Sequence, residues 1–282
     1  MHIEKIELQN FRNYNNLELE FSKNVNLILG KNAQGKTNLL EAVYLTAIGR
    51  SFRTSKDLDL VKFSENNAIV KVWAEKELNS TTVEISIKRK GEKSSEKFIK
   101  KDRKNVTKTS QLLKNILIVI FSPEDLKIVK DEPEKRRKFI DRELSQISPK
   151  YYNSLSNYKK SLLQRNTYLK EENLEPSIID LWDIQLAKYG AEVILLRKDF
   201  IKKLSEYSAQ IHSGITGDKE KLDIIYEPNV EIKESLSEQE DFIYRELKNS
   251  FKTDSRNRNT SVGPHRDDIS FIVNDIDMRN FG

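Results

Sequence analysis

The chain has 282 residues, with 49 Lys and Arg against 44 Asp and Glu and a formal net charge of +5. Its 37% hydrophobic residues suffice for a core, and its length allows one large or two modest domains. The absence of cysteine excludes a disulfide scaffold, a thiolate metal site and a cysteine nucleophile. No apolar run is long enough for a membrane span, and the first residues are unlike a signal peptide. We therefore expect a soluble, cytoplasmic protein with no membrane partner.

Strand patterns dominate the first 120 residues. Apolar and charged residues alternate over 17–21 and 83–87, which is typical of strands with one face on a core and one in water. Residues 26–29 and 116–121 are near-continuous apolar runs. Such runs predict strands covered on both faces, so we expect these two in the middle of a sheet.

Helical patterns dominate the rest. Residues 122–125, Ser-Pro-Glu-Asp, predict a helix start, since Ser caps helices, Pro suits the first turn and acids favour the N-terminus. Further helices are expected to begin at Pro133, Pro149 and Pro176. The last of these carries an apolar stripe that predicts a core face, consisting of Leu181, Ile184, Val193, Leu196, Phe200 and Leu204.

Shorter signals follow toward the end of the chain. Residues 221–226 and 269–273 predict strands, and Ser237 with Glu240 predicts a capping box that opens another helix. The fold class expected from these patterns is α/β, with a β-rich first lobe over 1–130 and a helical lobe over 131–255. A return segment, 256–282, completes the chain.

The strongest chemical signal is GKNAQGKT, residues 30–37, which matches the phosphate-binding pattern G-x-x-x-x-G-K-[ST] at every defined position. A buried-strand pattern precedes it and an apolar helix pattern follows, which is the context that a P-loop needs. Its backbone N–H groups and the helix N-terminus would hold a phosphate. Lys36 is expected at the β- and γ-phosphates and the Thr37 hydroxyl at Mg²⁺. The predicted nucleotide-binding residues are Gly30, Lys31, Asn32, Ala33, Gln34, Gly35, Lys36 and Thr37.

A second signal is the basic segment 88–108, with ten basic and three acidic residues. Lys and Arg on phosphates supply sequence-independent, salt-sensitive affinity for nucleic acid. With Phe98 as its one aromatic residue, the segment favours duplex or backbone contact over base stacking. A solvated charged hairpin is the alternative. The candidate DNA-binding residues are Lys88, Arg89, Lys90, Lys100, Lys101, Arg103 and Lys104.

Five segments in collinear order carry a resemblance: IELQNFRNY, GKNAQGKTNLLEAVYLTAIGRSFRT, FSPEDL, EPEKRRKFIDREL and TSVGPHRDD. Together they resemble the RecF family, bacterial DNA repair proteins of the SMC-like ABC ATPase group. The resemblance implies a P-loop NTPase fold of the ABC/SMC head type, with ATP and Mg as cofactors.

The resemblance also bears on single residues. It places Arg12 and Asn13 against the nucleotide, whereas Arg12 as a surface cation at a strand end is the alternative. Phe52 stands where the family pattern has His. His265 lies in the Gly-Pro-His-Arg-Asp element and is open to two interpretations, a hydrogen-bonded loop residue or a catalytic one.

The family's signature motif and Walker B strand are not found before Gly282, so no catalytic residue is assigned within this chain and weak hydrolysis is expected. We expect the natural protein to be longer. The partners implied are DNA, both duplex and single-strand/double-strand junctions, RecR and RecO, and indirectly RecA, with an ATP-dependent homodimer. The implied role is recombination, replication and repair after DNA damage, within the SOS response. An ABC-type ATPase subunit not coupled to DNA is the alternative function.

Overall fold

The computed structural model of the chain describes residues 1–77, 79–122 and 125–280. Its contacts divide it into two compact units, Met1–Val119 and Ile120–Gly282. The sequence placed the first boundary at residue 130 and set 256–282 apart. Those domain limits remain a prediction.

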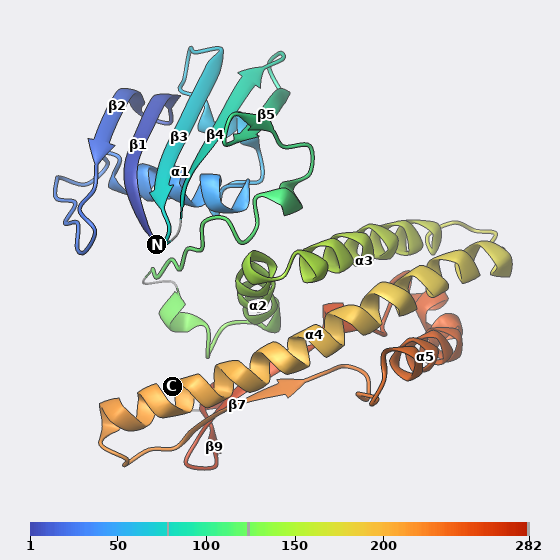
Figure 1. Cartoon of the computed structure of the whole chain (residues 1–282). Helices are drawn as coiled ribbons and strands as arrows, with labels where there is room; N and C mark the ends of the chain where they lie inside the picture. The colour runs from blue at the N-terminus through green and yellow to red at the C-terminus, as the bar shows by residue number, and fades with distance from the viewer. Residues whose placement is uncertain (78, 123–124, 281–282) are drawn as a thin grey trace. The chain divides into compact units, whose positions relative to one another are not determined.

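The first unit is built on a six-stranded antiparallel sheet in the order β2-β1-β3-β4-β5-β6 (Figure 1). Its strands are β1 (His2–Phe11), β2 (Tyr14–Glu20), β3 (Asn67–Glu75), β4 (Ser80–Arg89), β5 (Ser95–Lys101) and β6 (Lys104–Asn105). Along β3 and β4 buried and half-exposed residues alternate, because successive side chains point to opposite faces. The strand predicted over 83–87 is confirmed within β4, and the one predicted over 17–21 lies in β2 as far as Glu20.

One helix, α1 (Lys36–Ile48), covers the inner face of this sheet (Figure 1). It is apolar on most sides, and its residues from Leu39 to Ile48 are largely buried. They pack in the unit whose inward strand positions include Ile6, Val72 and Ile85, each at most 1% exposed. This packing holds the start of α1, and with it the phosphate-binding loop, against one face of the sheet.

The two central strands predicted from apolar runs are wrong. Residues 26–29 and 116–121 are irregular. Ile116 is buried and Ile118 and Ile120 are half-buried, but the other apolar side chains are exposed, with Leu27 at 78% and Val119 at 83%. A strand is stabilised by ladder hydrogen bonds to a neighbour, and no described strand pairs with either segment. An apolar run in the sequence does not show whether a neighbouring strand is present to pair with it.

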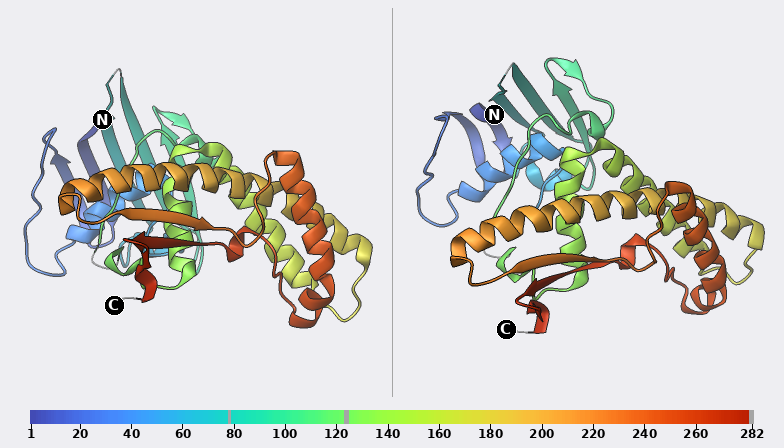
Figure 2. Two further views of the ribbon diagram at one scale, coloured as in Figure 1. Left: turned by 90° about the horizontal axis from the view of Figure 1, so that it is seen from below. Right: turned by 60° about the horizontal axis from the view of Figure 1, so that its bottom comes forward.

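The second unit is mainly helical (Figure 2). Its helices are α2 (Pro133–Ile147), α3 (Pro149–Tyr168), α4 (Pro176–Thr216) and α5 (Leu236–Asn257). A three-stranded antiparallel sheet, β7 (Leu222–Glu227), β8 (Asp268–Val273) and β9 (Ile276–Asp277), lies along part of α4. Each of α2, α3 and α4 begins at the proline that marked it in the sequence, since a first-turn proline loses no intrahelical bond.

The core of this unit consists of apolar clusters between α4 and its neighbours, one of which joins Tyr158, Leu186, Ile194 and Leu247. The predicted stripe on α4 is only partly correct. Val193 is buried, but Leu181 is 61% and Ile184 is 44% exposed. Helical spacing identifies one side of a helix, whereas burial depends on how far the neighbouring helices extend along it.

Two predicted helix starts also differ from the structure. The capping box is formed by Ser235 and Glu238, not by Ser237 and Glu240, so α5 begins earlier. Of the predicted start over 122–125, Pro123 and Glu124 lie outside the described residues. Ser122 donates from its backbone N–H to the Asp125 carboxylate at 2.7 Å, and a single 3-10 turn follows, Asp125–Lys127.

Candidate nucleotide-binding site

The predicted P-loop connects an irregular segment to α1. Gly30 and Gly35 have φ values of 154° and 105°, and Lys31, Asn32, Ala33 and Gln34 between them are exposed. Gly35 is the N-cap of α1, with no side-chain cap and no acidic residue in the first turn. The first amide groups of the helix therefore lack an intrahelical or side-chain acceptor and suit an anion.

Lys36 folds over this loop. Its ammonium donates to the carbonyl oxygens of Gly30 at 2.6 Å and Lys31 at 2.8 Å. The cation is therefore held against the loop backbone, and its residue is the first of α1. This arrangement can neutralise the charge of a bound phosphate.

The turn between β1 and β2 braces the loop. Asn13 donates to the Gln34 carbonyl at 3.1 Å and accepts from the Asn38 amide at 2.8 Å. Tyr14 donates from its hydroxyl to the Gly35 carbonyl at 3.1 Å. Asn13, predicted at the nucleotide, is thus next to the loop and bonded to its backbone.

Arg12, the other residue predicted there, is held by Glu41 of α1. The guanidinium donates from Nε at 2.9 Å and from Nη2 at 2.6 Å to the two oxygens of that carboxylate. Ser51 donates to Glu41 at 2.5 Å, and Arg53 lies 3.3 Å from it. Burial would raise the pKa of Glu41, but these partners outweigh it and hold the pKa below its ordinary value.

A cleft opens beside the loop at these groups. It is lined by Arg12, Asn13, Asn38, Arg53, Leu58, Asp59, Val61, Phe63 and Arg89. Three arginines against one aspartate make the lining cationic. Sequence reasoning found Arg12 and Asn13 but missed Glu41, because a glutamate inside an apolar helix pattern gives no local sign of its partners.

The described residues fit a phosphate better than a free metal ion. No group of three or more His, Cys, Asp or Glu residues among them is arranged for a metal. The exposed Thr37 hydroxyl is the one candidate ligand from the motif. Because Mg²⁺ is commonly held by one or two protein groups together with substrate phosphates, Thr37 suits it only as part of a nucleotide complex.

Comparisons with known proteins agree with this geometry. A family model described as the RecF/RecN/SMC N terminal domain matches residues 2–172. The DNA replication and repair protein RecF of Clostridium tetani is 42% identical over 284 aligned residues, covering 100% of this chain and 76% of that protein. Its counterpart in Clostridium botulinum is 43% identical over 283, again covering 100% of this chain and 76% of that protein.

The chain belongs to the RecF family.

Solved RecF structures support the same assignment. The recombination mediator protein RecF with ATPrS, from the RecFOR pathway, matches with a TM-score of 0.92 and 37% identity, covering 99% of this chain and 76% of that chain. The corresponding RecF-ATP structure matches at 0.90 and 36%, covering 100% of this chain and 75% of that one. The predicted fold class, an α/β ATPase head of the ABC/SMC type, is confirmed.

Two of the remaining RecF family motifs, the basic α2 segment and the Gly-Pro-His-Arg-Asp element, meet in the second unit around residues 264–268. Arg136 of the basic α2 segment binds Asp268 through two hydrogen bonds of 2.7 and 2.8 Å. Arg197, 2% exposed, donates to Asp141 and Asp267 at 2.8 Å each. These buried pairs hold α2, α4 and the Gly-Pro-His-Arg-Asp element together, which is a structural role for motifs of the family.

His265 belongs to the same structural arrangement. Its Nε2 lies 3.0 Å from the Thr260 carbonyl oxygen, which can only accept, and its Nδ1 lies 2.6 Å from the Tyr158 hydroxyl. The neutral ring therefore donates through Nε2 and accepts at Nδ1. Burial lowers the pKa of His265 to about 4, despite the Thr260 hydrogen bond, and the charges of Arg266 and Arg137 act with burial. Of its two interpretations, this geometry supports the hydrogen-bonded loop residue.

The seven candidate DNA-binding residues lie at the two ends of the β4–β5 hairpin. Lys88, Arg89 and Lys90 are at the turn between β4 and β5. Lys100, Lys101, Arg103 and Lys104 are at the other end of β5, where Asp102 and Arg103 form the turn into β6 with φ values of 49° and 67°. At about 3.3 Å per residue, the two groups lie roughly 20 Å apart along β5.

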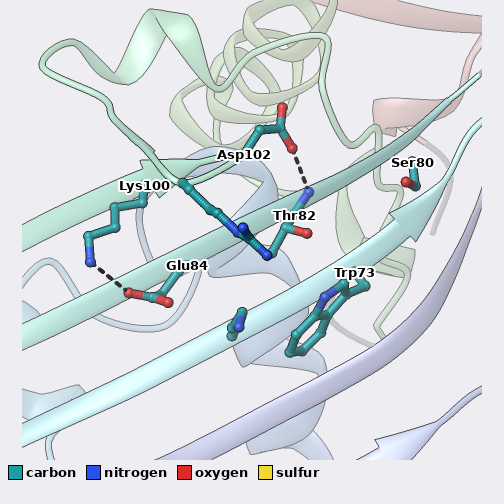
Figure 3. A pocket seen from close by; sticks show the side chains of 8 residues that line it. Trp73, Ser80, Thr82, Glu84, Lys100 and Asp102 are labelled. Atoms are coloured by element: carbon teal, nitrogen blue, oxygen red, sulfur yellow. Dashed lines mark hydrogen bonds and ion pairs between the residues drawn. The ribbon is translucent and has the colours of Figure 1, made fainter.

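Several of these cations have partners. Lys90 pairs with Glu96 at 2.8 Å and Lys100 with Glu84 at 3.3 Å, and Arg89 donates to the Glu65 carbonyl. Figure 3 shows the Lys100–Glu84 pair in a shallow pocket on the outward face of the sheet, near Trp73. Lys88, Arg103 and Lys104 make no ion pair within the part of the chain that the structure describes. The basic segment is thus not one continuous patch.

Across the described residues, no helix combines the length and the apolar character that crossing a bilayer requires.

Proposed function

We propose that this chain binds ATP at its P-loop and acts as the nucleotide-dependent part of a RecF-type DNA repair and replication protein. The observation that carries the proposal is the loop geometry, a glycine-capped helix start with the Lys36 ammonium folded over it, in a member of the RecF family. Mg²⁺ enters with the nucleotide, through the Thr37 hydroxyl.

The cellular part of the proposal rests on the relatives. It comprises DNA binding at gaps and junctions, action with RecO and RecR to promote RecA loading, ATP-dependent dimerisation and a cytoplasmic location. ATP acts as a switch by binding the DNA-competent dimer better than the monomer, and it shifts the equilibrium only by that difference in affinity.

The first test is Lys36→Ala. Removing the ammonium removes a charged hydrogen-bond donor from the phosphate site, so we expect ATP affinity to fall by about tenfold or more. Titration with a fluorescent ATP analogue measures the change. Lys23→Ala is the matched control, since Lys23 is an exposed lysine of the preceding segment whose ammonium pairs with Glu75 at 3.5 Å. Equal affinity of the Lys36 variant and the wild type would contradict the proposal.

The second test concerns DNA. Phosphate contacts make binding fall steeply with salt, so we expect duplex binding at low salt that weakens as salt rises. Because Arg103 and Lys104 project from the β5–β6 turn without an ion pair among the described residues, replacing both with Ala is expected to lower the salt slope by about one to two. Lys88→Ala with Lys90→Ala is the comparison at the other end.

The rival function predicts a different outcome. An ABC-type ATPase subunit not coupled to DNA would bind ATP normally and show no duplex binding even at low salt. That result would exclude the DNA part of the proposal and leave the nucleotide part standing.

A further inference from the structure

Glu41 is an unusual residue for its position. It lies in α1, one turn after the P-loop Thr37, and is 0% exposed. Among the described residues of the first unit, it is the only charged side chain that is fully buried. A buried carboxylate is costly unless opposite charges and hydrogen bonds replace its water, so its partners must be specific.

Its partners come from two other segments. Arg12, in the turn after β1, holds both oxygens at 2.9 and 2.6 Å. Ser51 and Arg53, in the segment after α1, reach it at 2.5 and 3.3 Å. One carboxylate therefore joins the β1–β2 turn and the segment after α1 to the P-loop helix.

The partners are themselves fixed by further bonds. Arg12 also donates to the Asp59 carbonyl at 2.8 Å, and Arg53 donates to Asn38, on α1 beside the loop, at 2.7 Å. The Ser51 hydroxyl accepts the backbone N–H of Arg53 at 2.9 Å. Arg12 and Arg53 both line the cleft next to the P-loop, and two guanidinium groups against one carboxylate leave the cluster with net positive charge.

We propose that Glu41 is a positioning residue that holds Arg12 and Arg53 at the edge of the P-loop, so that both guanidinium groups face the phosphates of a bound nucleoside triphosphate. The inference rests on the proposed ATP binding and deepens it. Bidentate pairing suits this task because a planar guanidinium held on one edge keeps its remaining N–H groups in a fixed direction. The low pKa of Glu41 keeps its charge in place across the physiological pH range.

The inference differs from a purely structural role in what it predicts. If Glu41 only stabilised the fold, replacing it would lower stability and leave the affinity of the folded protein unchanged. If it positions cations for phosphates, the loss must grow with the number of phosphates on the ligand. ATP, ADP and adenosine therefore separate the two roles.

The experiment compares Glu41→Gln with the wild-type chain at a temperature where circular dichroism shows both folded. We expect ATP affinity to fall about tenfold, ADP affinity less and adenosine affinity not at all, because only the orientation of the two cations changes. Glu41→Asp keeps the carboxylate on a shorter side chain, so its ATP affinity is expected to lie between those of the wild type and Glu41→Gln. Glu84→Gln is the matched control, since that carboxylate pairs with Lys100 on the outward face of the sheet.

A double-mutant cycle adds an independent readout. If Glu41 acts through Arg12, adding Glu41→Gln to Arg12→Ala must weaken ATP binding by much less than it does in the wild type. Additive losses would overturn the inference, and so would wild-type ATP affinity in a folded Glu41→Gln protein.

Two controls keep these outcomes distinct. If Glu41→Gln does not fold, Ser51→Ala is the deciding variant. It removes the hydroxyl that donates to the Glu41 carboxylate and accepts from the Arg53 backbone N–H, but it changes no charge. A several-fold loss of ATP affinity in this variant supports the inference, and wild-type affinity contradicts it. Lys36→Ala measured in parallel tests ATP binding itself. Loss with Lys36→Ala but not with Glu41→Gln would reject the positioning role alone.

Discussion

Two ionisable side chains, the buried Glu41 and the half-buried His265, differ in protonation because their neighbours differ: Glu41 is ionised and His265 is neutral. Glu41 is surrounded by Arg12, Arg53 and a hydroxyl, which compensate its lost water and keep it ionised. Among the described residues, His265 has a carbonyl and a phenol as hydrogen-bond partners, and burial together with nearby cations favours the neutral ring. Burial disfavours the charged form of both groups; the cationic partners of Glu41 outweigh it, whereas the Thr260 hydrogen bond of His265 does not.

The first residue-scale prediction concerns acid stability. The folded pKa of His265 is about 4, below the ordinary value of 6.5. The unfolded chain therefore takes up the proton first as pH falls, and the contribution of neutral His265 is fully present above pH 6.5 and is lost on the way down through pH 4. The loss amounts to at most about 3 kcal/mol.

The measurement is the free energy of unfolding of wild type and His265→Asn by denaturant at pH 7.5, 6, 5 and 4. Carboxylates titrate in both proteins, so the difference between the two isolates the histidine. We expect the wild type to be more stable than His265→Asn at neutral pH. The difference in their free energies of unfolding is expected to decrease as the pH falls. An equal difference in unfolding free energy at pH 7.5 and pH 4 would show that His265 does not titrate as described.

At the scale of elements, the entry into α1 shows how one backbone position controls a site. Gly35 has a φ of 105°, and a Cβ there would lie 2.7 Å from the Asn13 Oδ1 and 2.9 Å from the Tyr14 hydroxyl. Both atoms belong to the turn that braces the P-loop. The residue must therefore be glycine for two reasons, the left-handed backbone and the close approach of that turn.

Gly35→Ala is accordingly expected to destabilise the chain by about 1–3 kcal/mol and to weaken ATP binding. The control is Gly214→Ala, in α4, where nothing lies within 4 Å of the added methyl group and φ is not positive. That change is expected to stabilise the chain by about 0.5–1 kcal/mol, because alanine favours a helix interior. Thermal unfolding of both variants checks the pair, and equal destabilisation by both would refute it.

At the scale of the whole molecule, the chain leaves two apolar segments uncovered. Most apolar side chains of residues 25–29 and 117–121 are exposed, although Ile118 and Ile120 are half-buried, and no described strand pairs with these segments. The core of the first unit is formed instead by the inner face of the antiparallel sheet and α1. In this chain, stability therefore does not depend on the most apolar segments of the first 120 residues.

This distribution can be tested with two leucines. Leu27 is 78% and Leu8 is 3% exposed. Leu27→Ala is expected to change the free energy of unfolding of this chain by no more than about 0.5 kcal/mol, whereas Leu8→Ala is expected to cost about 2–5 kcal/mol. Denaturant unfolding measures both. A loss of several kcal/mol from Leu27→Ala would mean that the segment is buried in a sheet after all.

The sequence by itself determined the features that depend on near neighbours in the chain. The P-loop is identified by residues 30–37 alone, the helices begin at Pro133, Pro149 and Pro176, and the alternation over 83–87 marks a strand with one buried face. The order of motifs also indicated the RecF family, which the relatives confirm. These signals are local because turn geometry, capping and side-chain period act within a few residues.

Only the tertiary structure decided which distant residues meet. Glu41 with Arg12 and Arg136 with Asp268 are 29 and 132 residues apart in the chain, so no spacing rule links them. The exposure of Leu181 depends on where neighbouring helices end, and the division of the basic segment into two groups depends on the length of β5. Burial and pairing are properties of packed neighbours, and packing brings together segments whose separation along the chain carries no information about their contact.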